Sequence, residues 1–162
     1  MSRQTTELET QRRQQSAPAS PAANTWRPRA MLALAVLGTA IAGYLTWVHY
    51  SGQLALCTGA GGCETVQASR YSAVAGVPVA LLGLLAYLGL LGVTIWRVYA
   101  GLATPIGVML ALFGLALAGV LYSGYLTYLE LFVIHAICPW CASSAAIMAA
   151  IFVLACWELS QW

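Results

Sequence analysis

Four long apolar stretches, separated by polar segments, organise the chain. They cover residues 30–48, 78–96, 102–122 and 139–157, and each is nearly free of charge. A helix needs roughly 20 mostly apolar residues to cross a membrane. The third stretch can continue towards Tyr128, because nothing before Glu130 is charged. The pattern predicts an all-α integral membrane protein, a bundle of four transmembrane helices with an external loop between the first two.

Composition supports lipid as the main solvent of this chain. Of its 162 residues, 60% are hydrophobic and 7% are charged, whereas soluble domains carry roughly 25% charged residues. The net charge of +2 is small and the arginines are dispersed along the chain, which argues against a nucleic-acid surface. We therefore expect no nucleic-acid partner.

Residues 1–29 are rich in Gln, Arg, Ser, Thr and Pro and contain almost no large apolar side chains. This composition predicts a disordered tail. A signal peptide is the alternative reading of the tail and first helix, since Ala40, Ile41 and Ala42 imitate a small-residue cleavage site. Apolar sequence continues to Val48, however, and the preceding tail is unusually long, so we expect the first helix to be retained.

The arginines predict an orientation, because cytoplasmic segments beside membrane helices collect positive charge. Six arginines lie before the first helix or between helices two and three, and only Arg70 lies on the opposite side. The six are Arg3, Arg12, Arg13, Arg27, Arg29 and Arg97. We predict that both termini are cytoplasmic, including the short C-terminal segment 158–162.

Glycines recur within the predicted helices. Small residues let helices approach each other closely in lipid, so these glycines predict a packed bundle. They are Gly38, Gly43, Gly83, Gly89, Gly92, Gly107, Gly114 and Gly119.

Four of the five cysteines fall on the predicted outer side, namely Cys57, Cys63, Cys138 and Cys141. Cys156 follows on the last helix, roughly 22 Å deeper at 1.5 Å rise per residue, and cannot reach them. Disulfides form and persist on the outer side of a bacterial membrane. The two external pairs therefore indicate disulfides or disulfide exchange.

The CPWC motif at residues 138–141 has the properties of a redox-active pair. Pro139 suits the first position of a helix, so Cys138 is predicted at the helix N-cap. Cys141 then lies on the same face of the helix, close enough to bridge, and the helix dipole stabilises a thiolate at this end.

The other pair, Cys57 and Cys63, encloses a flexible segment with three glycines, residues 58–62. Glycine lets the backbone adopt many conformations, so the two sulfurs can meet or separate easily. This suits a shuttle of electrons, and a fixed disulfide that ties down an external loop is the alternative.

Several segments together resemble the vitamin K epoxide reductase family, specifically its bacterial members. The resemblance covers roughly residues 30–157. It rests on Cys57, on CETVQASRY at 63–71, on GVP at 76–78 with LLG at 81–83, and on YLTY at 125–128 leading into the CPWC motif.

The resemblance implies a four-helix bundle around a quinone, either ubiquinone or menaquinone, in a bacterial inner membrane. It also implies that Cys57 and Cys63 receive electrons from a thioredoxin-fold partner and pass them to Cys138 and Cys141. Cys141 would face the quinone. Ser69 matches a family serine near the active site.

Two departures refine this expectation. Many bacterial members carry a fused thioredoxin-like domain, which this chain lacks after its last helix, so the expected partner is a separate thioredoxin-fold protein of the DsbA type. Animal members use an active-site asparagine to reduce vitamin K epoxide, whereas the one asparagine here is Asn24 in the tail. We therefore do not expect epoxide reduction.

Three tyrosines at the outer end of the third helix, Tyr122, Tyr125 and Tyr128, are candidates for a hydrogen bond to a quinone oxygen. An interfacial belt of tyrosines is the alternative. His49 and His135 are candidate proton relays, since histidine titrates near neutrality, or are simply solvated at the interface.

Glu130 and Glu64 are equally placed for a proton relay, but both are predicted to lie in external water, where a carboxylate needs no special role. A different class of function also remains open: a structural or transport membrane protein whose external cysteines form fixed disulfides or bind zinc. Zinc motifs usually present a second matching pair, which the C-x5-C spacing does not supply. The unrelated oxidases of the DsbB type place their two cysteine pairs in the reverse order. The leading prediction is a thiol:quinone oxidoreductase.

Overall fold

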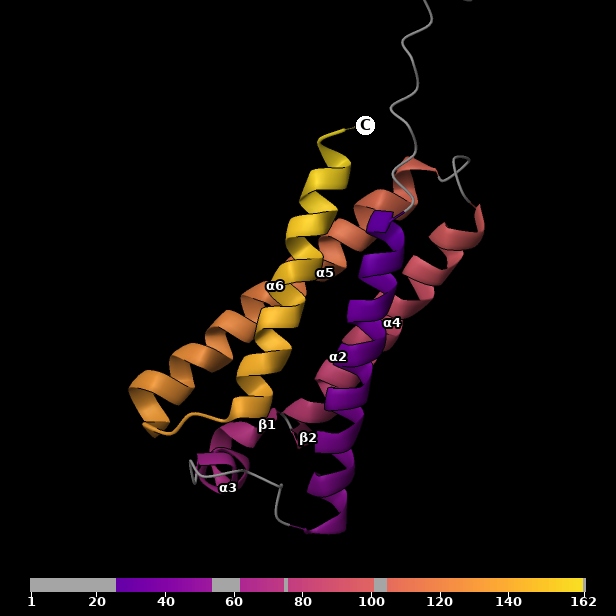
Figure 1. Ribbon diagram of the computed structural model, residues 1–162. Coiled ribbons are helices and arrows are strands. Elements are labelled where there is room, and N and C mark those ends of the chain that lie inside the picture. Colours follow the sequence, from indigo (N-terminus) through magenta and orange to yellow (C-terminus); the bar gives the residue numbers. More distant parts are fainter. Residues whose placement is uncertain (1–25, 54–61, 75, 101–104, 162) are drawn as a thin grey trace, which may run out of the picture.

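The computed structural model describes residues 26–53, 62–74, 76–100 and 105–161, which form a bundle of long helices (Figure 1). The long helices are α2 (Trp26–Ser51), α4 (Val79–Ala100), α5 (Ile106–Leu129) and α6 (Pro139–Leu159). Within the described residues, four helical segments are long and apolar enough to cross a membrane. The predicted all-α membrane fold with four transmembrane helices is confirmed.

The helices pack so that α2 contacts α4 and α6, and α5 contacts the same two neighbours. Short elements gather at one end of the bundle, beside the connection from α5 to α6, while the start of α2 and the C-terminal end lie at the other (Figure 1). These short elements are α3 (Gly62–Ala68), the 3-10 helix η1 (Arg70–Ser72), the strands β1 (Ala73–Val74) and β2 (Val77–Pro78), and the π-helical turn η3 (Glu130–Ile134).

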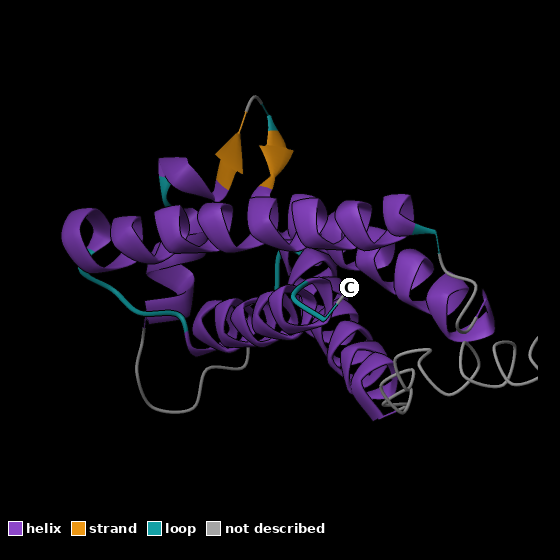
Figure 2. Ribbon diagram, turned by 90° about the horizontal axis from the view of Figure 1, so that it is seen from above, coloured by secondary structure: helices purple, strands orange, loops and turns teal. Residues whose placement is uncertain are grey.

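The two strands form a small antiparallel hairpin, in which Ala73 pairs with Pro78 and Val74 with Val77. Gly76 has a φ of +83°, a conformation that side chains with a Cβ atom avoid. Seen from above, the hairpin stands out on one side of the bundle (Figure 2). It leads directly into α4, which therefore starts at the same end as α3.

The core and the outer faces of the helices are both apolar. Met31, Tyr87, Leu90, Leu112 and Ile151 are almost completely buried where the helices meet. Many large apolar side chains face outwards instead, among them Val36, Leu85, Leu121 and Val153. An apolar surface of this extent is unfavourable in water and matches lipid.

The glycine prediction is correct in part. A Cβ atom at Gly38 would overlap the ring of Tyr87 on α4, and one at Gly119 would overlap Met148 on α6. At Gly83, Gly92, Gly107 and Gly114 an added Cβ would meet nothing within 4 Å. Close helix approach therefore depends on particular positions, because only one side of each helix faces another helix.

The first helix starts earlier than residue 30, so the predicted tail boundary is wrong for residues 26–29; residues 1–25 lie outside the described part. Pro28 is tolerated because N–H groups in the first turn lack helical partners. Arg27 is buried, with its guanidinium 4.4 Å from the centre of the Trp157 ring and Nη1 donating to Gln161 Oε1 at 2.7 Å. Contacts to α6 thus make an arginine part of the bundle.

The other three helices end beyond their predicted boundaries, whereas α4 and α5 begin inside theirs. The second helix runs from Val79 to Ala100, after Pro78 of strand β2. The last helix continues past Trp157 because Glu158 is buried in an ion pair with Arg97 of α4. The third helix starts at Ile106 and is followed by η3, which keeps the chain helical to Ile134.

Candidate functional site

The CPWC motif forms the N-terminus of α6, with Cys138 as the N-cap residue and Pro139 in the first turn, as predicted. Cys138 is completely buried and Cys141 is partly buried. Both thiols are free, and a hydrogen bond joins the two side chains. The first turn of α6 therefore brings the two sulfurs together, in a geometry from which a disulfide can form.

The surroundings of Cys138 favour its thiolate. The hydrogen bond from the Cys141 side chain is the largest cause and, with backbone N–H groups of Cys141 and Trp140, lowers the pKa of Cys138 to about 7. Burial and the nearby charge of Glu130 oppose this shift. A helix N-terminus with a thiol pair is an environment that produces reactive thiolates.

Cys63 lies on α3, in the same buried cluster as Cys138 and Val48. Both cysteines have 0% exposure, although they are far apart in the sequence. Cys63 is disulfide-bonded, in contrast to Cys138, Cys141 and Cys156. The predicted loop partner, Cys57, lies outside the described residues. The fold thus places one cysteine of the loop motif beside the first cysteine of the CPWC motif.

Glu130 belongs to this site, although the sequence analysis considered it for a proton relay and did not select it. It was expected in external water, but its exposure is only 6%. Its Oε2 accepts a hydrogen bond from the Cys138 N–H at 3.2 Å, and its carboxyl group is also hydrogen-bonded to the Cys141 side chain. The expectation was wrong because the π-helical turn after α5 directs this side chain inwards.

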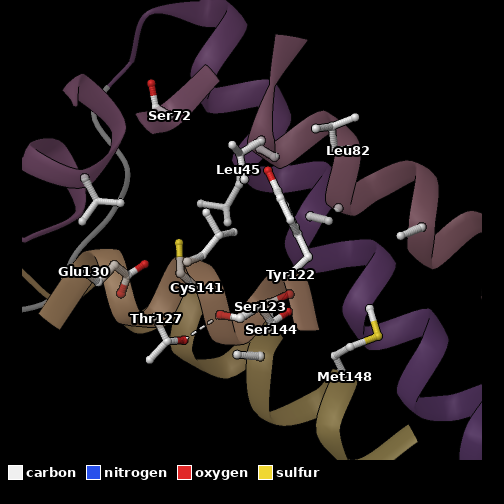
Figure 3. A pocket seen from close by; sticks show the side chains of 18 of the residues that line it. Leu45, Ser72, Leu82, Tyr122, Ser123, Thr127, Glu130, Cys141, Ser144 and Met148 are labelled. Carbon is white, nitrogen blue, oxygen red and sulfur yellow. Dashed lines mark hydrogen bonds between the residues drawn. The ribbon is translucent and has the colours of Figure 1, made fainter. Parts of the chain in front are cut away.

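A cavity of about 340 Å³ lies between the helices next to these thiols (Figure 3). Its walls come from all four long helices and from η1, and they are mainly apolar. Cys141, Glu130, Tyr122 and Ser144 contribute its polar atoms near the CPWC motif. Cys138 does not line the cavity, so the two cysteines of the pair face different surroundings.

The tyrosine hydroxyls differ in their environments. Tyr122 lines the cavity, and its hydroxyl is buried with no hydrogen-bond partner among the described residues. Figure 3 shows its side chain extending towards Leu45, on the same side of the helices as Cys141. Tyr87 also lines the cavity, but its hydroxyl donates to the Ser144 carbonyl oxygen at 2.7 Å. Tyr122 therefore offers the free polar group.

Of the other residues predicted to contact the cofactor, one lines the cavity and two are exposed on the surface. Ser69 lines the cavity, and its hydroxyl donates to the Val66 carbonyl oxygen at 2.7 Å. Tyr125 and Tyr128 are 53% and 56% exposed and do not line it. The structure therefore gives no support to these two as cofactor contacts, and their exposure fits the interfacial alternative.

The two candidate proton-relay histidines lie in different environments. His49 lines the cavity near the end of α2. His135 is exposed and does not line it, and it ends η3 with a φ of 55°. Cys156 lies near the opposite end of α6, away from the other thiols (Figure 1).

No group of three His, Cys, Asp or Glu side chains in the described segments is arranged to hold a metal ion. The fold and site instead define a multi-pass membrane protein that carries thiol chemistry beside an apolar cavity. A model of the vitamin K epoxide reductase family matches residues 29–156, and the chain belongs to this family. It is therefore, in general terms, a membrane disulfide oxidoreductase, from a family whose members use quinones.

Proposed function

We propose that this protein is a quinone-dependent, disulfide-forming oxidoreductase. It takes electrons from the thiols of a separate thioredoxin-fold protein and passes them through two cysteine pairs to ubiquinone or menaquinone. The main observation in support of this proposal is the spatial arrangement of the cysteines, which lead from the loop to the cavity. Cys63 and Cys138 share one buried cluster, and Cys141, the partner of Cys138, lines the cavity.

The relay consists of thiol–disulfide exchanges, each through a mixed disulfide. A thiolate of the partner attacks the Cys57–Cys63 disulfide, and the second thiol of the partner resolves the mixed disulfide, so the partner leaves oxidised. The reduced loop pair then attacks Cys138, which breaks the Cys138–Cys141 bond and leaves the electron pair on Cys141. Resolution of this second mixed disulfide restores the loop disulfide and leaves both CPWC cysteines reduced.

The cavity suits a quinone head group. Its walls are mainly apolar, as the flat ring of a quinone requires, and the buried Tyr122 hydroxyl has no partner among the described residues. Tyr122 would donate to a ring oxygen, while Cys141 supplies the sulfur at the cavity wall. When bound, a quinone accepts two electrons and two protons, so it is the oxidant for the thiol pair.

The proposal includes an orientation in a bacterial cytoplasmic membrane, with both termini inside and both cysteine pairs outside. Arg27 and Arg97 lie at the bundle end opposite α3, as expected for the cytoplasmic side. Single cysteines at exposed Glu64 and at exposed Ser160, each in a chain without other cysteines, would test it. An impermeant maleimide should label Glu64→Cys in intact spheroplasts and leave Ser160→Cys unlabelled; the reverse pattern would invert the orientation.

The activity is tested with the purified full chain in detergent, with dithiothreitol as donor and a soluble ubiquinone or menaquinone analogue as acceptor. The loss of quinone absorbance gives the rate. Cys141→Ser should abolish this reaction because no sulfur remains at the cavity wall, whereas Cys156→Ser is the matched control and should keep the parent rate. Absence of quinone reduction by the parent chain, or full activity in Cys141→Ser, would contradict the proposal.

A further inference from the structure

The position of Glu130 is fixed by its backbone. It is the first residue of the π-helical turn η3, and its carbonyl oxygen accepts the N–H of Ala136 at 3.1 Å as well as that of His135. His135 closes the turn in the left-handed conformation. Single π-helical turns often occur at functional sites, and here the turn holds a carboxyl group beside the thiols.

The carboxyl group contacts both cysteines of the CPWC pair, but in different ways. It accepts the backbone N–H of Cys138, whereas its contact with Cys141 is with the thiol itself, whose single proton faces two acceptors, the Cys138 sulfur and the Glu130 carboxyl group. In Figure 3 the Glu130 carboxyl group and the Cys141 sulfur lie next to each other at the cavity. Glu130 therefore touches the sulfur that faces the cavity, and both side chains line it.

A merely structural role does not explain why this side chain is an acid. A glutamine oxygen would accept the Cys138 N–H equally well without a buried charge, which is costly unless it is paired. The ion pair formed by described residues joins Arg97 to Glu158, not to Glu130. A negative charge also opposes formation of the Cys138 thiolate. What a carboxyl group can do and an amide cannot is accept and return a proton.

We propose that Glu130 is a catalytic residue that carries the proton of Cys141. The inference deepens the proposed function and rests on it for the identity of the final oxidant. Oxidation of the pair forms the Cys138–Cys141 bond and releases two electrons and two protons. A bound quinone would take up the two electrons, together with one proton from Glu130 and one from water. Cys138 enters the step as the thiolate, its proton already lost, and the proton of Cys141 passes to the Glu130 carboxylate. Glu130 then releases it to the cavity.

The same group acts in the opposite direction when the loop pair reduces the disulfide. A thiolate of the loop pair forms a bond with the Cys138 sulfur, the Cys138–Cys141 bond breaks, and its electron pair leaves on Cys141. Glu130 has by then taken up a proton from water through the cavity, and it donates this proton to that sulfur. Proton transfer by a group already hydrogen-bonded to the sulfur avoids placing a new charge in the apolar cavity.

The test measures the reactivity of Cys141 without any quinone. The reduced full chain in detergent is treated with N-ethylmaleimide, and mass spectrometry gives separate alkylation rates for Cys141 and Cys156. Glu130→Gln should slow alkylation of Cys141 by about a hundredfold, the low end of general acid–base effects. Cys156 lies far from Glu130 and is the internal reference. Glu64→Gln removes an exposed carboxylate and is the matched control, which should change neither rate.

The sign of the effect separates the possible roles. If Glu130 acts only as an acceptor for the Cys138 N–H, glutamine preserves the rate, and if it acts only as a repelling charge, glutamine increases the rate. Either result would overturn the proposal. Glu130→Asp withdraws the carboxyl group by one methylene and should give an intermediate rate. Circular dichroism checks the helices, and a parent-like Cys141 rate in either folded variant decides against the proposal.

This measurement can succeed or fail independently of the proposed function. If the parent chain fails to reduce quinone, the alkylation rates still report on proton transfer from Cys141. If the parent chain reduces quinone but the Glu130 variants alkylate at the parent rate, the relay stands and the role of Glu130 does not.

Discussion

Gly62 lies directly against the backbone carbonyl group of Ile137, and the space between them admits no Cβ atom. Gly62 precedes Cys63 at the start of α3, and Ile137 precedes Cys138 at the start of α6. The contact between two backbones therefore brings the two following cysteines into one buried cluster. A glycine that had been predicted only to make the loop flexible instead permits a close approach.

The first prediction concerns this contact. Gly62→Ala forces α3 away from Ile137, because the carbonyl group cannot move as a flexible side chain could. Small displacements of reacting groups can reduce rates up to about a hundredfold, so oxidation of a thioredoxin-fold donor should fall roughly tenfold to a hundredfold. Quinone reduction by dithiothreitol should change little, because a small dithiol reaches Cys141 through the cavity. Quinone absorbance with each donor measures both rates.

Gly92→Ala is the matched control for Gly62→Ala. An added Cβ at Gly92 meets nothing within 4 Å, and alanine favours a helix over glycine by about 1 kcal/mol. This variant should keep both donor rates. If Gly62→Ala also oxidises the protein donor at the parent rate, the packing of α3 on Ile137 does not control exchange between the pairs.

The sequence was sufficient for the features that lipid and local geometry determine. Helix number follows from the length of apolar chain that a membrane requires, and the place of Cys138 follows from the preference of proline for the first helical turn. Both predictions are confirmed by α6 and the other long helices. These properties depend on residues near one another in the chain, so the sequence alone contains them.

Burial of polar groups was predicted poorly, because it depends on contacts between distant segments. Glu130 and Arg27 are both buried, whereas the sequence placed them in water and in a disordered tail. The regular spacing of the tyrosines was also misleading. Three residues advance only 300° around a helix, so Tyr128 is rotated roughly 120° from Tyr122. Only Tyr122 then faces the cavity.

The second prediction separates the tasks of the two cysteine pairs. Cys63→Ser should abolish oxidation of the protein donor but preserve quinone reduction by dithiothreitol, because Cys138 and Cys141 remain intact. Dithiothreitol can attack Cys141, and the low pKa of Cys138 makes it a good leaving group. Cys57→Ser should behave in the same way, while Cys141→Ser should lose activity with both donors. Equal losses with dithiothreitol in all these variants would refute a relay through separate pairs.

The third prediction follows from the lowered pKa of Cys138. Below a pH of about 7, reduction of the Cys138–Cys141 disulfide takes up two protons, and above it only one, because Cys138 stays as the thiolate. The reduction potential should therefore fall by about 59 mV per pH unit below this value and by about 30 mV above it. Equilibration with dithiothreitol buffers, followed by mass spectrometry of the trapped Cys138–Cys141 peptides, gives the potential at each pH.

Glu130→Gln tests in which direction the charge of Glu130 changes the pH dependence of this reduction potential. The charge of Glu130 raises the pKa of Cys138, so its removal should move the change of slope to a lower pH. An ordinary thiol would place the change near the unperturbed value of 9.0. A change of slope near that value in the parent chain would show that the Cys141 hydrogen bond does not stabilise the Cys138 thiolate.

The last prediction compares Tyr122→Phe with Tyr125→Phe. The Tyr122 hydroxyl is buried without a partner among the described residues, which is unfavourable for folding. Its removal should leave the midpoint of thermal unfolding unchanged or higher. The same change removes one hydrogen bond to the proposed quinone, worth about 0.5–1.5 kcal/mol, so KM for the quinone should rise about two- to tenfold with little change in kcat.

Tyr125 is exposed and away from the cavity, so Tyr125→Phe should change neither quantity. Steady-state quinone reduction and thermal unfolding monitored by circular dichroism measure both effects. An unchanged KM in Tyr122→Phe, or a rise of equal size in Tyr125→Phe, would remove Tyr122 from the proposed quinone site.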